Sequence, residues 1–519
     1  MTEENNSMTK GEFYHWQTPR PPGFLNTRVL LKNAAISYPD KLVIDANMDI
    51  HRSYRDVDER ARRISNGLLA RNKPGDFVAI LSRVGAVESI ELLFGIYGAS
   101  MTAIPLSYRL KPSEIENVLK YTNARALIFD EKFKPIVDQI SLDIDTYMFG
   151  LDPQGDYSFN ELLQHGAGQP DVAIYDHTPA CLGFTSGTTG APKAYIRSHY
   201  ANVVNALSYV ECMDFTSSDV IMNCIPPLTG LGLNTGAIAA RATIINIDFN
   251  PAEVLAAIEK YKPTYLYSVP AMYAFMMEVP DFDKYDLSSL RAVGSVGAPL
   301  PKPALEKIWQ KICPNLYDHL GMQEVGFIAV SKPDMKRMKP NSVGPPTMYT
   351  EHRIVDGVGN ELPVGEVGEI TVRYPDGAGE YWKDPIKTAE CIKNGWFYTG
   401  DLGKLDEQGF LYIVGRAKDM IVSGGYNVFA VDVENVLLSH LKISDAAVVG
   451  LPDEKWGEKV AAVVVLKPNE SVTEDEIMEF CKERMAGYKA PKKIIFEDIP
   501  RNLAGKVLKY KIVAKYSAA

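Results

Sequence analysis

At 519 residues the chain exceeds the roughly 250 to 300 residues at which single hydrophobic cores stop growing, so two or more domains are expected. Hydrophobic residues make up 46% of the chain and charged residues 23%, a balance that excludes an intrinsically disordered protein. The formal net charge of -10 argues against a nucleic-acid-binding protein, which needs a basic surface, and favours small molecules as partners.

The N-terminal residues 1–24 begin polar and acidic and then become Pro-rich, without the basic and apolar regions of a signal peptide. No run reaches the roughly 18 apolar residues of a membrane-spanning helix, so a soluble, cytoplasmic protein is expected. The six cysteines lack the spacing of metal ligands, and buried, reduced thiols are the preferred interpretation. They are Cys181, Cys212, Cys224, Cys313, Cys391 and Cys481.

Between residues 26 and 130, segments with helical periodicity alternate with buried strands. Helices are expected over 53–72 and 86–100, and strands over 76–82 and 101–107. The same alternation resumes later, with helices over 252–263 and 303–313 and a strand over 264–270. Strands that alternate with helices are typical of βαβ units, so an α/β fold is expected for this large N-terminal part.

Near Val343 the pattern changes to short strands separated by Gly, Asp and Pro, which predicts a β-rich lobe. Strands and amphipathic helices return near the C-terminus, with strands over 445–451 and 459–468 and helices over 431–443 and 473–488. About a hundred residues are enough for a separate small α+β domain. The boundary is placed at Arg416 to Asp419, so residues 1–415 and 416–519 are the expected domains.

The stretch "FTSGTTGAPKA" combines Gly, hydroxyl residues and a Lys. Such a loop can bring backbone N–H groups close to phosphate oxygens while the Lys neutralises charge, although an isolated run of this kind can equally be a solvated turn. The spacing of Gly187 and Gly190 differs from that of a Walker loop. A second glycine-rich run, "GLGLNTG" from Gly230, has one residue too many for a dinucleotide fingerprint and no convincing helix start after it.

With five further motifs, this loop resembles the signatures of the adenylate-forming superfamily, which includes acyl- and aryl-CoA ligases, luciferases and the adenylation domains of peptide synthetases. The chain is most similar to the AMP-forming acyl-CoA ligases. The further motifs, in chain order, are "VGAPLP" at Val296, "GMQE" at Gly321, "WFYTGDLG" at Trp396, "GRAKDMIVSGGYNVF" at Gly415 and "PRNLAGKVLK" at Pro500.

The resemblance implies a nucleotide site. Glu324 is implied as the Mg²⁺ ligand, Asp401 as a contact to the ribose and Arg416 as a contact to the ribose and phosphate. Lys506 is implied as the lysine that joins the substrate carboxylate and the α-phosphate, with Gln323 and Lys193 also catalytic. The other implied ATP or AMP contacts are Thr185, Ser186, Gly187, Thr188, Thr189, Gly190, Gly297, Ala298, Pro299, His319, Leu320, Gly321 and Met322. The chain departs from the usual pattern at several positions. Leu320 replaces an aromatic residue, Gln323 replaces a Thr, Ala430 replaces a Pro, and Asp432 replaces a longer acid; "TGLGLN" stands where an aromatic residue or His is common.

The resemblance also implies a path for CoA and a pocket for the acid. Ser423, Gly424, Gly425 and Trp456 are the implied CoA contacts, and Lys418 is the implied hinge about which a mobile C-terminal lid turns between the two half-reactions. Residues without side chains allow close approach of the CoA arm. The acyl pocket is expected among Tyr267, Met272, Ser295, Gly230, Gly232, Asn234 and His319.

The sequence therefore predicts an ATP-dependent acyl-CoA ligase with Mg²⁺ and CoA, acting on a fatty or aryl acid. Two alternatives remain: a stand-alone enzyme that loads an aryl or amino acid onto a carrier protein, and a non-catalytic nucleotide-binding protein of the same fold. A homodimer is one assembly that the sequence allows.

Overall fold

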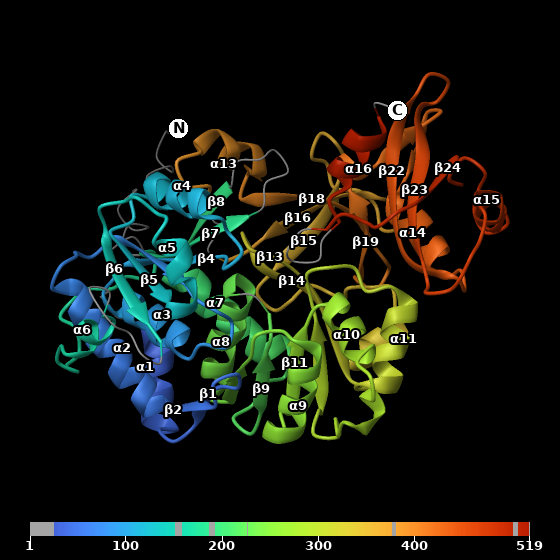
Figure 1. Cartoon of the computed structure of the whole chain (residues 1–519). Coiled ribbons are helices and arrows are strands. Elements are labelled where there is room, and N and C mark those ends of the chain that lie inside the picture. The colour runs from blue at the N-terminus through green and yellow to red at the C-terminus, as the bar shows by residue number, and fades with distance from the viewer. Residues whose placement is uncertain are drawn as a thin grey trace, which may run out of the picture.

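Two mostly parallel β-sheets, connected by helices, form the first part of the chain in the computed structural model (Figure 1). The structure describes residues 25–150, 158–185, 193–225, 227–375, 380–501 and 507–517. The first sheet has the strand order β14-β13-β12-β11-β9-β10-β1-β2, and the second has the order β6-β5-β3-β4-β7-β8. Only β2, β14 and β8 run antiparallel to their neighbours in these two sheets, as far as the described residues show.

The first sheet consists of β1 (Leu42–Asp45), β2 (Ile50–Ser53), β9 (Val220–Asn223), β10 (Thr243–Asn246), β11 (Tyr265–Ser268), β12 (Ala292–Ser295), β13 (Leu316–Met322) and β14 (Gly326–Ser331). The second sheet consists of β3 (Phe77–Leu81), β4 (Thr102–Leu106), β5 (Ala126–Asp130), β6 (Asp145–Phe149), β7 (Pro179–Thr185) and β8 (Lys193–Ser198). The inner strands are almost wholly apolar because helices cover both faces of each sheet.

The helices lie in three layers around these sheets. The hydrophobic core between the two sheets contains α1 (Arg28–Ser37), α2 (Tyr54–Leu69), α3 (Glu88–Gly98), α7 (His199–Cys212) and α8 (Pro227–Ala240). The outer face of the first sheet packs on α9 (Pro251–Tyr261), α10 (Pro270–Met277) and α11 (Lys302–Lys311), and that of the second on α4 (Pro112–Thr122) and α5 (Lys134–Val137). Between β6 and β7 lies the short α6 (Asn160–Leu163).

Local sequence explains why these elements form where they do. The Ser53 side chain accepts a hydrogen bond from the backbone N–H of Asp56 in a capping box that starts α2. The buried positions Val57, Ala61 and Ile64 recur at helical spacing along its inner face. The helices and strands expected between residues 53 and 107, and those between 252 and 313, are confirmed.

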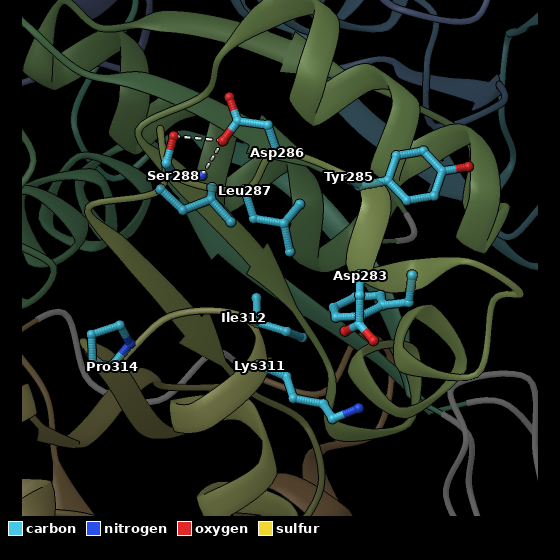
Figure 2. A pocket seen from close by; sticks show the side chains of 10 residues that line it. Asp283, Tyr285, Asp286, Leu287, Ser288, Lys311, Ile312 and Pro314 are labelled. Atoms are coloured by element: carbon cyan, nitrogen blue, oxygen red, sulfur yellow. Dashed lines mark hydrogen bonds between the residues drawn. The ribbon is translucent and has the colours of Figure 1, made fainter.

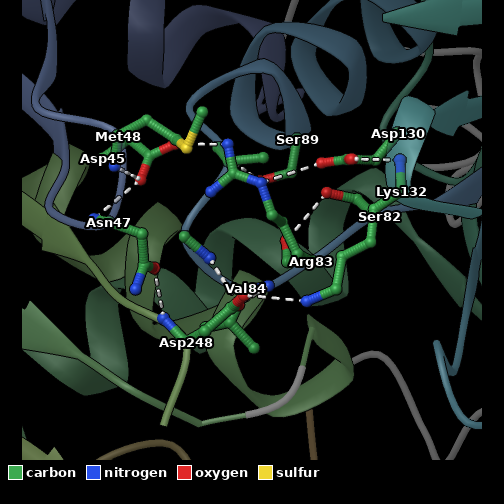
Figure 3. Close-up of polar contacts among 12 residues, drawn as sticks. Asp45, Asn47, Met48, Ser82, Arg83, Val84, Ser89, Asp130, Lys132 and Asp248 are labelled. Atoms are coloured by element: carbon green, nitrogen blue, oxygen red, sulfur yellow. Dashed lines mark hydrogen bonds and ion pairs between the residues drawn. The ribbon is translucent and has the colours of Figure 1, made fainter. Parts of the chain in front are cut away.

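The carboxyl ends of the two sheets lie side by side (Figure 3). Arg83, which follows β3, pairs with Asp45 at the end of β1 (2.5 Å) and with Asp130 at the end of β5 (2.9 Å). Asp248, which follows β10, accepts hydrogen bonds from the backbone N–H groups of Val84 (2.8 Å) and Gly85 (3.2 Å). Ligands of parallel α/β sheets bind at the carboxyl ends of strands, so both sheets present this edge to a common site.

After β14 the chain forms an antiparallel lobe, as expected from the sequence near Val343. The lobe contains β15 (Glu351–Val355), β16 (Gly368–Arg373), β17 (Ile392–Lys393), β18 (Trp396–Leu405) and β19 (Leu411–Arg416), with α12 (Pro333–Met338) before it and α13 (Pro385–Cys391) within it. A 3-10 turn over Ala417–Asp419 then leads out of β19, at the predicted boundary.

The last part of the chain is a separate α+β domain, seen in red beside the lobe in Figure 1. Its sheet contains β20 (Ile421–Ser423), β21 (Tyr426–Val428), β22 (Ile443–Asp453), β23 (Gly457–Leu466) and β24 (Lys493–Phe496). One face packs on α14 (Ala430–Leu438) and α15 (Glu474–Lys482), and the other on α16 (Lys509–Tyr516). The predicted fold class, a large α/β part with a β-rich lobe and a small C-terminal α+β domain, is confirmed; the mobility of that domain stays a prediction.

Three smaller expectations can be compared with the structure. No helix among the described residues is long and apolar enough to cross a membrane. All six cysteines are free thiols; Cys212, Cys224, Cys313 and Cys481 are buried, whereas Cys181 and Cys391 are partly exposed. The glycine-rich run that starts at Gly230 lies inside α8, which begins before the run at Pro227, so no helix starts after it. Burial against α7 offsets the low helix propensity of glycine there.

Candidate active site

Two motifs expected to bind the nucleotide meet beside β8. Lys193 is the first residue of β8, and Gln323 and Glu324 form the turn between β13 and β14. A segment from the lobe runs along β8: the Ile196 N–H donates to the carbonyl of Glu380 (2.9 Å), and the Trp382 N–H donates to that of Ala194 (2.8 Å). This pairing brings the lobe against the strand that follows the glycine-rich loop.

Two tyrosines hold the side chains of this turn. The Tyr195 hydroxyl on β8 donates to Oε1 of Gln323 (2.9 Å), and the Tyr381 hydroxyl donates to Oε1 of Glu324 (3.1 Å). Tyr195 and Tyr381 are themselves paired by a β-bridge. The exposed fractions of Tyr195, Tyr381 and Glu324 are 1%, 8% and 7%. A buried carboxylate with a single phenol donor retains oxygen lone pairs for a cation.

The second group of implied nucleotide contacts lies on β18 and β19. Asp401 and Arg416 face each other across these strands, and Arg416 Nε lies 2.6 Å from Asp401 Oδ1. The pKa of Lys418, two residues further on, is lowered, mainly by burial. The positive charges of Arg416 and Lys193 lower this pKa further, and the negative charges of Asp419 and Asp401 raise it. Charges act over about 10 Å at ordinary ionic strength. Lys193 and the Asp401–Arg416 pair therefore both lie within electrostatic reach of Lys418.

A further group of implied ATP or AMP contacts occupies the ends of two adjacent parallel strands. Gly297 follows β12 with a φ of +83°, which favours glycine, and Gly297 and Pro299 are exposed while Ala298 is partly exposed. Leu320, Gly321 and Met322, at the end of β13, are partly exposed. Both groups thus lie at the carboxyl edge, where their surfaces can contact a ligand.

Most of the expected acyl-pocket region is filled by aromatic rings. His319 stacks on Phe327 (ring centroids 4.4 Å apart), Phe327 meets Tyr209 edge-on (4.6 Å), and the Tyr267 hydroxyl lies 2.6 Å from Nδ1 of His319. These four side chains are at most 7% exposed. Burial lowers the pKa of His319 to about 3, so its imidazole is neutral at physiological pH.

The remaining acyl-pocket candidates divide between two faces of the first sheet. Gly232 of α8 lies against Tyr209, because a Cβ there would be 3.4 Å from Cε2 of that ring, and Asn234 is buried in the same helix. Met272 packs in the core on the opposite face of the sheet. Ser295 is buried and faces that side too, because neighbouring residues of a strand point to opposite faces and position 294 points toward Tyr267. The side chain of residue 230 is outside the described part of α8.

The implied CoA contacts form their own cluster in the C-terminal sheet. The N–H of Gly424 donates to the carbonyl of Trp456 (2.8 Å), and Ser423 is paired with Gly457. A Cβ on Gly424 would lie 2.7 Å from the Trp456 ring, whereas one on Gly425 would meet nothing within 4 Å. Trp456 is 43% exposed, so its ring covers the glycine turn and still faces outward.

Some implied residues lie outside the described part of the chain: Ser186, Gly187, Thr188, Thr189, Gly190 and Lys506. For Thr185, the end of β7, only the backbone is described. A surface cavity of about 490 Å³ contains none of the predicted site residues (Figure 2). It is lined by Leu290 and Pro314, which precede β12 and β13, and so lies at the amino edge of the sheet, opposite the candidate site.

Comparison with known proteins places the chain in a family. A model described as AMP-binding enzyme matches residues 31–382, and one for the C-terminal domain of AMP-binding enzymes matches residues 432–506. The chain therefore belongs to the AMP-binding enzyme family, whose members form adenylates, and is an enzyme of the acid–thiol ligase class.

Its relatives include several CoA ligases. The chain is 33% identical to the long-chain-fatty-acid–CoA ligase FadD13 of Mycobacterium tuberculosis, over 94% of this chain and 98% of that protein. It is 32% identical to the indoleacetate–CoA ligase of Aromatoleum aromaticum, over 81% and 85% of the two chains. Among solved structures, the anthranilate CoA ligase AuaEII in complex with anthranoyl-AMP is similar, with a TM-score of 0.87 and 27% identity over 94% of this chain and 97% of that one.

Proposed function

We propose that this protein is an ATP-dependent, AMP-forming acyl-CoA ligase. The observation that carries the proposal is the arrangement of motif residues around β8 and the lobe beside it. Lys193 begins β8, Glu324 accepts from Tyr381, which pairs with Tyr195 of β8, and Asp401 and Arg416 form an ion pair in the lobe. In the first step a carboxylate oxygen of the acid attacks the α-phosphorus of ATP and pyrophosphate leaves. In the second step the CoA sulfur attacks the acyl carbonyl and AMP leaves.

The first step needs charge neutralisation around the phosphates more than covalent chemistry from the protein. Lys193 and the glycine-rich loop before it would hold the β- and γ-phosphates, and Lys506, outside the described residues, would approach the reacting carboxylate. The described residues contain no group of three His, Cys, Asp or Glu side chains that could hold a metal. Mg²⁺ binds through one or two carboxylates plus phosphates and water, and Glu324 is the carboxylate that would hold it.

Replacing Asp401 by Asn is expected to weaken AMP binding by about 10- to 100-fold, because a ribose hydroxyl loses a charged acceptor and Arg416 its partner. Calorimetric titration with AMP measures this without any acid. Asp406→Asn is the matched control: this carboxylate also pairs with a cation, Lys339, but within a turn of the lobe, so thermal stability should fall and AMP affinity should not. Unchanged AMP binding by Asp401→Asn would contradict the ribose role.

The second step would use the C-terminal domain. Lys418 lies in the 3-10 turn between lobe and domain, where a small change in backbone angles can redirect the whole domain. We infer that rotation about this turn brings the glycines beside Ser423 to the adenylate. Trp456 would then pack against the pantetheine arm of CoA.

The aromatic cluster of Tyr209, Tyr267, His319 and Phe327 supports a compact acid as the substrate. The rings fill the space between the end of the first sheet and α7, and even the glycines there leave no gap: a Cβ at position 294 would lie 2.4 Å from Cδ2 of Tyr267. An extended acyl chain would have to displace several buried rings. We therefore propose a single-ring or short-chain acid.

The test is a panel of acids with ATP, Mg²⁺ and CoA, in which AMP and thioester are both measured. Benzoate, phenylacetate and hexanoate are the compact acids, and palmitate is the long one. Compact acids are expected to exceed palmitate in kcat/KM by about 10- to 100-fold, since overpacking a core costs about 1 to 3 kcal/mol. Comparison of benzoate and phenylacetate with hexanoate also distinguishes an aryl substrate from a short aliphatic one.

Failure to form a thioester with CoA from any acid in the panel would reject the proposed reaction. Thioester formation only with a phosphopantetheinylated carrier protein would favour the carrier-loading alternative. Faster use of palmitate than of every compact acid would leave the reaction standing and reject the size limit.

A further inference from the structure

Two phenol hydroxyls reach two consecutive side chains of the turn between β13 and β14. Tyr195 donates to Gln323 (2.9 Å) and Tyr381 donates to Glu324 (3.1 Å). The two tyrosines are partners in one β-bridge, so their hydroxyls are held at a fixed spacing by paired backbone. The polar groups of this turn are therefore oriented from one side by a rigid support.

A glycine provides the room for Tyr195. Gly183 on β7 is the register partner of Tyr195 on β8. A Cβ at position 183 would lie 2.1 Å from the Tyr195 hydroxyl oxygen and 2.2 Å from Cζ, far inside van der Waals contact. The phenol can lie over this strand and reach Gln323 only because residue 183 has no side chain.

The hydrogen bond from Tyr195 determines how the Gln323 amide group is oriented. Burial is the main cause that raises the pKa of Tyr195 well above its usual value, so its hydroxyl remains a donor at every working pH. The two polar ends of a Gln side chain point in different directions from one planar carbon. Fixing Oε1 of Gln323 therefore fixes the direction in which its NH₂ group donates.

We propose that Tyr195 is a positioning residue for the adenylate-forming step: it orients the Gln323 amide so that the NH₂ group donates to an α-phosphate oxygen. Gln323 stands where the family usually has a Thr, whose side chain is shorter than that of Gln and extends less far toward Tyr195. Gly183, Tyr195 and Gln323 would thus act as a linked set. This inference rests on the proposed function, because it needs ATP at the site.

A double-mutant cycle tests the linkage. The acid is the best one from the panel, and acid-dependent exchange of pyrophosphate into ATP is measured for wild type, Tyr195→Phe, Gln323→Thr and the double variant. Tyr195→Phe is expected to lower kcat for exchange by about 10-fold, the effect of one lost hydrogen bond, with a smaller change in KM for ATP. In the Gln323→Thr background the same substitution should change the rate by less than about twofold.

Two further variants separate positioning from a general loss of stability. Tyr54→Phe is the matched control, because Tyr54 is also fully buried and its hydroxyl also donates to an internal acceptor, the Ala242 carbonyl, away from the site. It should lower thermal stability and leave exchange unchanged. Gly183→Ala keeps the Tyr195 hydroxyl but displaces the ring, so it should reproduce the loss seen with Tyr195→Phe.

Three results would overturn the inference: an undiminished exchange rate in Tyr195→Phe, an equal loss from this substitution in the wild-type and Gln323→Thr backgrounds, or an equal loss of thioester formation from a supplied acyl-adenylate. None of these three results would contradict the proposed function. That function fails instead if the wild-type protein shows no acid-dependent exchange with any acid of the panel.

Discussion

Replacing Glu324 by Gln is expected to lower acid-dependent pyrophosphate exchange by about 100- to 1000-fold, because a metal ion that neutralises phosphate charge is worth several kcal/mol in the transition state. Gln retains the volume of the side chain and an oxygen for the Tyr381 hydroxyl. The loss would thus come from the missing negative charge rather than from repacking of a residue that is only 7% exposed.

Three measurements make this result specific. The Mg²⁺ concentration that gives half-maximal exchange should rise in Glu324→Gln. Tyr381→Phe, which removes the supporting hydroxyl and keeps the carboxylate, should cost only about 10-fold. Thioester formation from a supplied acyl-adenylate, which involves no pyrophosphate, should be close to wild type in both variants. An exchange rate within a few-fold of wild type, or an unchanged Mg²⁺ requirement, would exclude Glu324 as the metal ligand.

Local elements were predictable from the sequence because their signals are local. The cap at Ser53 and the spacing of Val57, Ala61 and Ile64 are sufficient to predict α2. The order of strands was not predictable, because it depends on contacts between distant segments: β1 pairs with β10, about two hundred residues away, and β9 lies between β10 and β11. The helix over Pro227–Ala240 was missed because its stability comes from burial, which outweighs the intrinsic preference of its glycines.

In the candidate site, too, some residues were predictable from the sequence and others were not. Lys193, Glu324, Asp401 and Arg416 stand in motifs, and the structure brings the latter two together at 2.6 Å. Tyr195 and Tyr381 belong to no motif quoted for the site, although they contact Gln323 and Glu324 directly. The only signal for Tyr195 was its position two residues after Lys193 on the same strand. Contacts of this kind depend on the pairing of β8 with a segment from another lobe.

Replacing Gly425 by Leu is expected to lower thioester formation from a supplied acyl-adenylate by about 100-fold, comparable to a displacement of reacting groups by about 1 Å, and to leave pyrophosphate exchange within about twofold of wild type. A Cβ at this exposed position meets nothing within 4 Å, so the new side chain starts in open space on the surface of its own domain. It would obstruct only a group that approaches the turn from outside, as the CoA arm is proposed to do.

The φ of Gly425 is +82°, so a Leu there also carries backbone strain that could act without blocking any path. Gly75→Leu is the matched control, because Gly75 has a φ of +89°, is exposed and likewise has nothing within 4 Å of its Cβ, but lies in the turn before β3, at the amino edge of the second sheet. It should show the same strain and wild-type rates for both half-reactions. Equal losses in the two variants would attribute the effect to strain, and an unimpaired Gly425→Leu would show that CoA reaches the adenylate by another route.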